Sequence, residues 1–254
     1  MQEVTFVLVA ALAAATLMVP QISGHGMVLD PIARGSRWRC NGKAPRNYDD
    51  NGLYCGGYFV QWGTNGGKCG PCGDNYADEM PRMNELGGVY GQGEIVKQYR
   101  RGAVIDVRVM ITANHMGHFE FNLCDLDGAM GNETDECYGQ YPLLDATGNR
   151  KWYLKSAAIG EYLVKVQLPA ELTCEHCSLQ WTYVAGNNWG WCGDGTGALG
   201  CGPQETFRTC SDISILDSND VRLYEGFDYC SRASRSLNAI LDDEIPESDV
   251  EEQD

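Results

Sequence analysis

Twelve cysteines constrain this 254-residue chain more than any other feature of its sequence. All of them lie between residues 40 and 230, and an even number of cysteines in an exported chain is typical of a disulfide framework. Up to six bridges are therefore expected, although the spacing does not reveal which cysteines pair. The cysteines are Cys40, Cys55, Cys69, Cys72, Cys124, Cys137, Cys174, Cys177, Cys192, Cys201, Cys210 and Cys230.

The amino terminus predicts export. Val4–Val19 is an apolar run of the length found in signal peptides, and the small residue Gly24 follows shortly after it. We predict that residues 1–24 are a signal peptide, that cleavage makes His25 the first residue, and that the mature protein is secreted and extracellular. Because the run is short for a membrane-spanning helix, no membrane attachment is expected after cleavage.

Negative charge is concentrated at the other end of the chain. The net charge is −16, and the segment 242–254 contains eight acidic residues and no basic ones. We predict that residues 234–254 form an acidic, disordered tail, which leaves 25–233 as one folded domain with a net charge of about −7. No basic patch is visible, so a nucleic-acid partner is not expected. We expect the protein to be a monomer.

Five segments alternate apolar and polar residues with a period of two, as half-buried strands do. They are the segments 105–111, 119–123, 162–168, 179–183 and 207–215. Glycine-rich loops separate them, and no segment shows a long helical period. We therefore predict an all-β fold, an antiparallel β-sandwich of the immunoglobulin or fibronectin III kind with long, disulfide-stapled loops. Most Trp and Tyr side chains are expected in its core.

Two CxxC motifs could indicate other chemistry. Cys69-Gly70-Pro71-Cys72 matches the thioredoxin-type redox sequence, which requires a preceding strand and a helix that begins at the cysteines. The flanking residues look like loop instead. The second motif, at Cys174 and Cys177, is about a hundred residues away, too far for a zinc ribbon. We predict structural disulfides for both.

The chain has four histidines, and the first has a special position. A histidine at a mature amino terminus offers both its α-amine and its ring Nδ1 to one metal ion, and the amine titrates near pH 7.7–8.0. One further imidazole completes a planar set of three nitrogens, which suits Cu(II). The candidates for this third nitrogen are His115, His118 and His176.

A set of ordered motifs resembles the lytic polysaccharide monooxygenases, specifically auxiliary activity family 15. The motifs span residues 25 to about 215, and their order is more specific than any one of them. They are His25-Gly26 with Pro31, Ser36-Arg37-Trp38-Arg39, Asn47-Tyr48-Asp49-Asp50-Asn51, Cys55-Gly56-Gly57, Gly67-Lys68-Cys69-Gly70, Cys72-Gly73-Asp74, Thr112-Ala113-Asn114-His115, Gly186-Asn187-Asn188-Trp189-Gly190 and the segment 197–213 (GALGCGPQETFRTCSDI).

The resemblance implies a histidine brace for copper. His25 would supply its amine and Nδ1, and His115 would supply the third nitrogen. His118 is the alternative, expected beside the site or on the surface, and His176 is expected on the surface.

Three further positions match parts of the family's site. Phe207 matches the axial position, Ala113 matches a small residue at the open face of the copper, and Gln204 or Glu205 would be a polar neighbour of the ligands.

The implied function is oxidative cleavage of a β-1,4-linked, insoluble polysaccharide, with chitin favoured over cellulose. Copper would cycle between Cu(II) and Cu(I), with an external electron donor and O2 or H2O2 as co-substrates. The alternatives are a non-catalytic chitin- or cellulose-binding module and a copper carrier with the same brace. Independently, the sequon Asn132-Glu133-Thr134 predicts N-glycosylation at Asn132 on an exposed loop.

Overall fold

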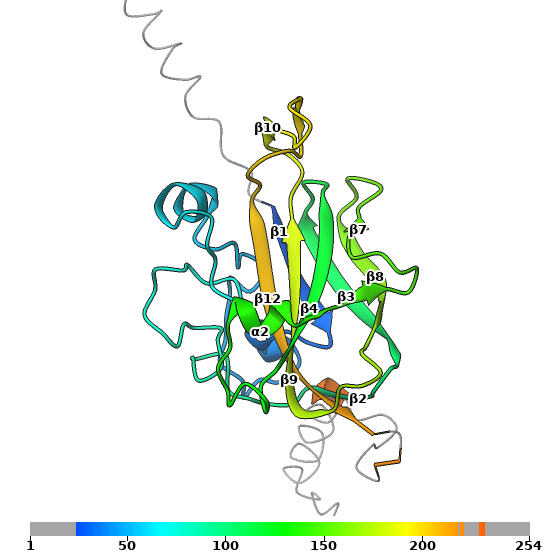
Figure 1. The fold of residues 1–254 in the computed structure, drawn as a ribbon. Coiled ribbons are helices and arrows are strands. Elements are labelled where there is room, and N and C mark those ends of the chain that lie inside the picture. Colours follow the sequence, from blue (N-terminus) through cyan, green and yellow to red (C-terminus); the bar gives the residue numbers. More distant parts are fainter. Residues whose placement is uncertain (1–23, 218, 221–228, 232–254) are drawn as a thin grey trace, which may run out of the picture.

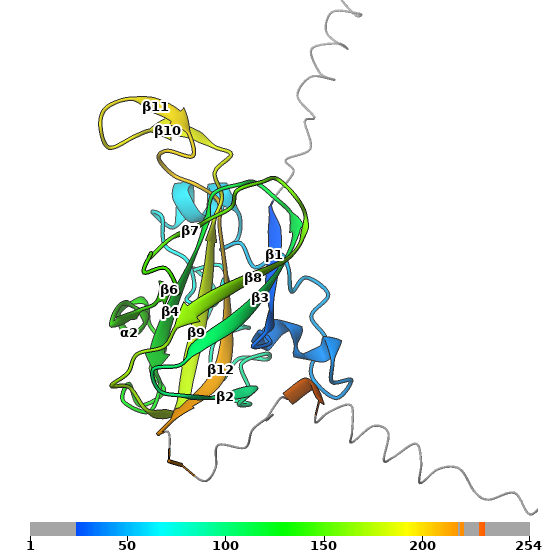
Figure 2. The ribbon, with the colours of Figure 1, turned by 90° about the vertical axis from the view of Figure 1, so that its right-hand side faces the viewer.

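The fold is a two-sheet β-sandwich with long loops and one projecting hairpin (Figures 1 and 2). The computed structural model describes residues 24–217, 219–220 and 229–231. Residues 1–23 of the predicted signal peptide and the predicted tail at 234–254 lie outside the described residues. No helix in the described part of the chain is long and apolar enough to cross a membrane.

Strands form most of the regular structure. They are β1 (His25–Asp30), β2 (Lys97–Arg100), β3 (Val104–Ala113), β4 (His118–Asp125), β5 (Tyr141–Pro142), β6 (Leu144–Asp145), β7 (Trp152–Tyr153), β8 (Gly160–Gln167), β9 (Cys174–Val184), β10 (Trp189–Trp191), β11 (Gly197–Leu199) and β12 (Thr206–Leu216). The helical segments are short: a 3-10 helix η1 (Arg34–Arg39), a π-helical turn η2 (Val60–Thr64) and α2 (Asp135–Gly139).

The strands make one four-stranded and one six-stranded sheet. The smaller sheet has the order β1-β3-β8-β6, and the larger has the order β2-β12-β9-β4-β5, with β7 also paired to β4. Every pairing in these two sheets is antiparallel except that of β2 with β12, which is parallel. The predicted β-sandwich is confirmed, and β2 is the one exception to its antiparallel character.

The period-two segments form the strands predicted from them. In β3, Ile105, Val107, Val109 and Ile111 are at most 3% exposed. The residues between them, such as Asp106 and Arg108, face outwards. Buried side chains from β4, β8, β9 and β12 join them in one continuous core between the sheets. Removal of this apolar surface from water is the main stabilising contribution to the fold.

The cysteines form six disulfides, as predicted. They join Cys40 to Cys230, Cys55 to Cys69, Cys72 to Cys210, Cys124 to Cys137, Cys174 to Cys177 and Cys192 to Cys201. Cys69 and Cys72 bond to different partners, so the thioredoxin-like motif is not a redox pair. Cys174 and Cys177 bond to each other within β9, which excludes the zinc ribbon.

A buried ionic network joins η1, β12 and the loop before α2. The guanidinium of Arg34 contacts Asp212 at 2.5 Å and Glu133 at 2.8 Å, with all three side chains at most 4% exposed. Burial alone would raise the pKa of Asp212, but Arg34, together with His176, outweighs burial and lowers it to about 2. The Nε2 atom of His176 lies 2.8 Å from Asp212, and its side chain is 22% exposed. His176 is therefore partly exposed, and its contact with Asp212 makes it part of this network as well.

Asp74 gives a prediction for stability. Burial raises its pKa to about 6, against two hydrogen bonds from the backbone and side-chain amides of Asn84. Since the folded state holds this proton more tightly than the unfolded state, stability falls as the pH rises from about 4 to 6. We expect Asp74→Asn to stabilise the protein at pH 7 by roughly 2–3 kcal/mol and to flatten this part of the pH profile. Urea unfolding of both proteins at pH 4, 5, 6 and 7 measures the effect.

The structure offers the new amide a partner, because Oδ1 of Asn84 is buried without one among the described residues. After rotation of the Asn84 amide, its Oδ1 atom would accept a hydrogen bond from the side-chain N–H that Asp74→Asn introduces. If the pH profiles of the two proteins run parallel between pH 4 and 6, the raised pKa of Asp74 is wrong.

Candidate functional site

His25 begins β1 at one end of the smaller sheet. β1 pairs with β3 so that His25 lies opposite Ala113, two residues before His115. The carbonyl of Asn51 accepts a hydrogen bond from the Gly26 amide at 2.9 Å, and the side-chain amide of Asn51 donates to Thr112 at 2.9 Å. The start of β1 is thus held between a loop and β3, which brings the two histidines to the same end of the sandwich.

His115 lies in the tight turn that joins β3 to β4. Its backbone amide donates to the hydroxyl of Tyr183 at 2.8 Å, and its carbonyl accepts from the Gly186 amide at 2.9 Å. The turn requires glycine at Gly117, which has φ +86°, because a Cβ there would lie 2.0 Å from the Val184 carbonyl. The backbone that presents the His115 ring is therefore fixed on both sides.

Gly24, the last residue of the predicted signal peptide, is packed directly between the groups of the candidate site. A Cβ on Gly24 would lie 3.2 Å from Nδ1 of His115 and 3.1 Å from the ring of Phe207. Such a Cβ would be three covalent bonds away from the backbone nitrogen of His25. In the uncut chain, the peptide bond between Gly24 and His25 thus lies beside the His115 imidazole.

Two polar side chains contact the site. Oε2 of Glu205 lies 3.6 Å from Nδ1 of His115 and accepts a hydrogen bond from the Gly24 amide at 3.1 Å. Nδ2 of Asn187 lies 2.8 Å from the same His115 nitrogen. Gln204 bonds instead to backbone atoms of Asn188 and Cys201, so it orders the loop around Asn187. Of the two predicted polar neighbours, Glu205 is the one that contacts the histidine.

Phe207 lies fully buried beneath the site. Its ring centroid is 6.3 Å from that of His25, 6.1 Å from that of Tyr54 and 5.6 Å from that of Tyr183. Burial raises the pKa of Tyr183 to about 12, although its hydroxyl accepts a hydrogen bond from the His115 amide. The groups below the histidines are therefore apolar or neutral. The sequence identified Phe207 but not Tyr54 or Tyr183.

The other histidines have partners elsewhere. His118 begins β4, where Nε2 lies 2.9 Å from Glu120 and the ring packs against Tyr153. A different cluster of possible metal ligands in the described residues consists of Cys72, Glu133 and Cys210. The two cysteines form a disulfide, and Glu133 is bound to Arg34. This cluster therefore has the character of a structural contact and not of a metal site.

The β10–β11 hairpin projects from the end of the sandwich at which β1 begins, and it carries two exposed tryptophans (Figures 1 and 2). Trp189 is 59% exposed, Trp191 is 69% exposed, and their ring centroids are 5.3 Å apart. The disulfide from Cys192 to Cys201 closes the hairpin. The sequence left open which aromatic residues lie outside the core, and the structure places this pair there. The Trp-Gly-Trp spacing was the available signal, because residues two apart on a strand share a face.

Comparison with known proteins agrees with this geometry. The family described as "lytic polysaccharide mono-oxygenase, cellulose-degrading" matches residues 25–213. The structure of a lytic polysaccharide monooxygenase AA15 from Thermobia domestica in the Cu(I) state is 46% identical in sequence to this chain. The similarity covers 75% of this chain and 98% of that chain, with a TM-score of 0.71.

Two other solved structures are less similar. A chitin binding domain from Burkholderia pseudomallei is 12% identical and covers 76% of this chain and 100% of its own, with a TM-score of 0.44. LPMO10B from Micromonospora aurantiaca is 14% identical with the same coverage and a TM-score of 0.42. No curated protein sequence matches the chain. The family match over most of the chain and the 46% identity show that the protein belongs to the lytic polysaccharide monooxygenases of auxiliary activity family 15, which oxidise polysaccharides.

Proposed function

We propose that cleavage after Gly24 creates a copper site from the α-amine and imidazole of His25 and the imidazole of His115, and that the enzyme uses it to oxidise chitin. The observation that carries this proposal is the packing of Gly24 against His115. It means that the amine released by cleavage would appear beside the second imidazole. Nitrogen donors of this kind suit Cu(II), and the amine loses its proton readily near neutral pH.

The residues around the histidines fit this donor set. Phe207 offers no ligand atom and blocks the underside of the site, while the partly exposed Ala113, opposite His25 in the sheet, leaves the outer side open. Glu205 and Asn187 contact Nδ1 of His115, so they would hold the ring through this nitrogen and leave Nε2 as the donor to the metal, as outer partners of metal-binding histidines commonly do. When bound, copper would take an electron from an external donor and activate O2 or H2O2 for oxidation of C1 or C4.

The tryptophan hairpin supports an insoluble, flat substrate. Large apolar side chains that are exposed together often mark a binding site, and an aromatic ring offers a flat apolar face on which a sugar can pack. The hairpin projects from the end of the sandwich that holds His25 (Figure 2). We propose that it lies on the polysaccharide surface and holds the enzyme over the bond that is oxidised.

We expect Trp189→Ala combined with Trp191→Ala to weaken binding to chitin particles by about tenfold, because each ring loses roughly 0.5–1.5 kcal/mol of stacking. Pull-down isotherms with β-chitin measure this, and Val104→Ala, an exposed apolar residue at the start of β3, is the control. Equal binding by the double variant and the unmodified protein would show that the hairpin does not contact the polymer.

The proposed function is tested with chitin, copper and a reductant such as ascorbate, followed by mass analysis of the soluble products. Oxidised oligosaccharides are expected from chitin, and a parallel assay on cellulose tests the substrate preference. Copper binding without any oxidised product from either polymer would instead indicate a carrier. Polymer binding without oxidised product would indicate a non-catalytic module. Asn132 is exposed, so its side chain is accessible for the predicted glycosylation, a modification that fits a secreted protein.

A further inference from the structure

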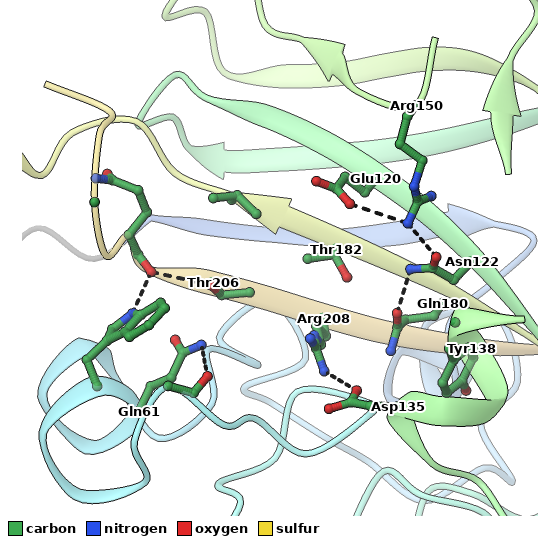
Figure 3. A pocket seen from close by; sticks show the side chains of 16 residues that line it. Gln61, Glu120, Asn122, Asp135, Tyr138, Arg150, Gln180, Thr182, Thr206 and Arg208 are labelled. Atoms are coloured by element: carbon green, nitrogen blue, oxygen red, sulfur yellow. Dashed lines mark hydrogen bonds and ion pairs between the residues drawn. The ribbon is translucent and has the colours of Figure 1, made fainter. Parts of the chain in front are cut away.

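A polar groove lies on the outer face of the larger sheet, away from the core (Figure 3). It has a cavity volume of about 520 Å³, within the range of ordinary ligand sites. Its floor consists of residues that alternate with core residues along the strands. On β9, Gln180 and Thr182 line the groove, whereas Trp181 and Tyr183 belong to the core.

The groove has two different walls. One wall is η2, where Trp62 is 37% exposed and its indole N–H donates to the Gln204 carbonyl at 2.9 Å. The other is α2, from which Asp135 and Tyr138 contribute. The groove thus begins at the loop that precedes Glu205 and leads along β9 and β12 towards α2.

Hydrogen bonds fix the polar side chains of the floor. Arg150 donates to Asn122 at 2.5 Å, Asn122 donates to Gln180 at 2.9 Å, and Gln180 donates to the Pro71 carbonyl at 2.7 Å. Figure 3 shows this chain crossing from β4 to β9. Planar amide and guanidinium groups that are already held in place can bind a hydroxylated ligand with little loss of side-chain entropy.

The charges of the groove balance. The ionic side chains that line it are Glu120, Asp135, Arg150 and Arg208, two acids and two bases. Arg150 lies 3.4 Å from Glu120, and Arg208 lies 2.8 Å from Asp135. Because each cation already faces a carboxylate, a phosphate or uronate would have to displace an internal partner. A neutral ligand with many hydroxyl groups has no such cost.

We propose that this groove is a second sugar site, which binds a single, neutral β-1,4-linked chain independently of the histidine pair. The sugar hydroxyls bond to the amide and ionic groups of the floor, and one sugar face packs on Trp62. The ligand class follows from the proposed function, since the same polymer is the substrate. A polymer strand loosened at the end of the sandwich that holds His25 would lie in this groove, beside the loop that carries Gln204.

The site is tested with soluble hexamers of β-1,4-linked N-acetylglucosamine and of glucose, titrated calorimetrically into the mature protein with and without copper. Binding is expected in both conditions, and the two hexamers distinguish the chitin and cellulose chemistries. In ¹⁵N-labelled protein, the indole signal of Trp62 should shift, whether or not those of Trp189 and Trp191 also respond. A shift confined to the hairpin indoles would overturn the proposal.

A pair of variants at one position completes the test. Thr182 lies between Glu120 and Arg208 across the floor, so Thr182→Tyr would fill the groove and Thr182→Ser would leave it open. We expect the Tyr variant to bind the hexamer at least about tenfold more weakly and the Ser variant to bind within about twofold of the unmodified protein. A folded Tyr variant with unchanged affinity, or equally tight binding of an oligogalacturonate hexamer, would contradict the proposal.

The two proposals fail separately. Thr182→Tyr should still produce oxidised oligosaccharides from insoluble chitin, and His115→Ala should still bind the soluble hexamer. Loss of hexamer binding in His115→Ala would place the hexamer at the histidines and overturn the second site. Absence of oxidised products from the unmodified protein would overturn the proposed function and leave the groove untouched.

Discussion

Replacement of His115 by Ala is expected to abolish the release of oxidised oligosaccharides from chitin. The proposed copper site has three nitrogen donors, and this variant removes one while leaving the amine and ring of His25. Loss of an outer partner of a metal ligand already costs about 10–100-fold in metal affinity or activity, so loss of the ligand should cost at least about a hundredfold. Product yield by mass spectrometry and copper affinity by calorimetry measure the two effects.

His118→Ala is the matched control, because His118 is three residues away and contacts Glu120 and Tyr153. Its copper affinity should stay close to that of the unmodified protein. If His118→Ala loses copper and His115→Ala keeps it, the choice between the two histidines is wrong. If neither variant changes copper binding, the site lies elsewhere in the chain.

The largest expected effect on stability comes from Asp212→Ala. Arg34 is 2% exposed and contacts both Asp212 and Glu133, so removal of Asp212 leaves a buried guanidinium with half of its compensating charge. Breaking a buried ion pair in this way costs about 3–5 kcal/mol. For a domain of this size, the melting temperature should fall by roughly 10 °C.

Asp106→Ala is the control for this effect, because the pair of Asp106 with Lys165 is more than half exposed. Exposed pairs contribute about 0–1 kcal/mol, so this variant should melt close to the unmodified protein. Acid unfolding provides a second measurement. Asp212 has a lowered pKa of about 2, so its contribution is present above about pH 4 and is lost as the pH falls towards 2. Equal melting temperatures for the two variants would contradict the role assigned to the buried network.

Much of the fold could be predicted because its signals are local. The alternation of Ile105, Val107, Val109 and Ile111 with polar residues follows from the geometry of one strand, and the structure confirms it. The pairing of the cysteines could not be predicted, because Cys72 and Cys210 meet only after loops and strands far apart in sequence come together. The parallel pairing of β2 with β12 is non-local in the same way.

For the site, the sequence was informative about the histidines and less so about their surroundings. His25 could be singled out from its position after the predicted cleavage site, and His115 from the family motif that contains it. The contact that favours Glu205 over Gln204 depends on the backbone just before β12, where Glu205 contacts His115 and Gln204 bonds to the backbone of Asn188. The partner of His176 was missed because Asp212 lies on another strand. The exposure of Trp189 and Trp191 could not be predicted, because composition does not distinguish exposed aromatic residues from the more common buried ones.

The central claim is that the free amine of His25 is part of the copper site. The most direct measurement compares two copper-loaded proteins, one that begins at His25 and one that retains Gly24, in their yield of oxidised oligosaccharides from chitin. Gly24 would keep its place against His115 and Phe207, and the nitrogen of His25 would remain an amide. We expect oxidised products only from the protein that begins at His25. Equal yields from the two proteins would contradict the account.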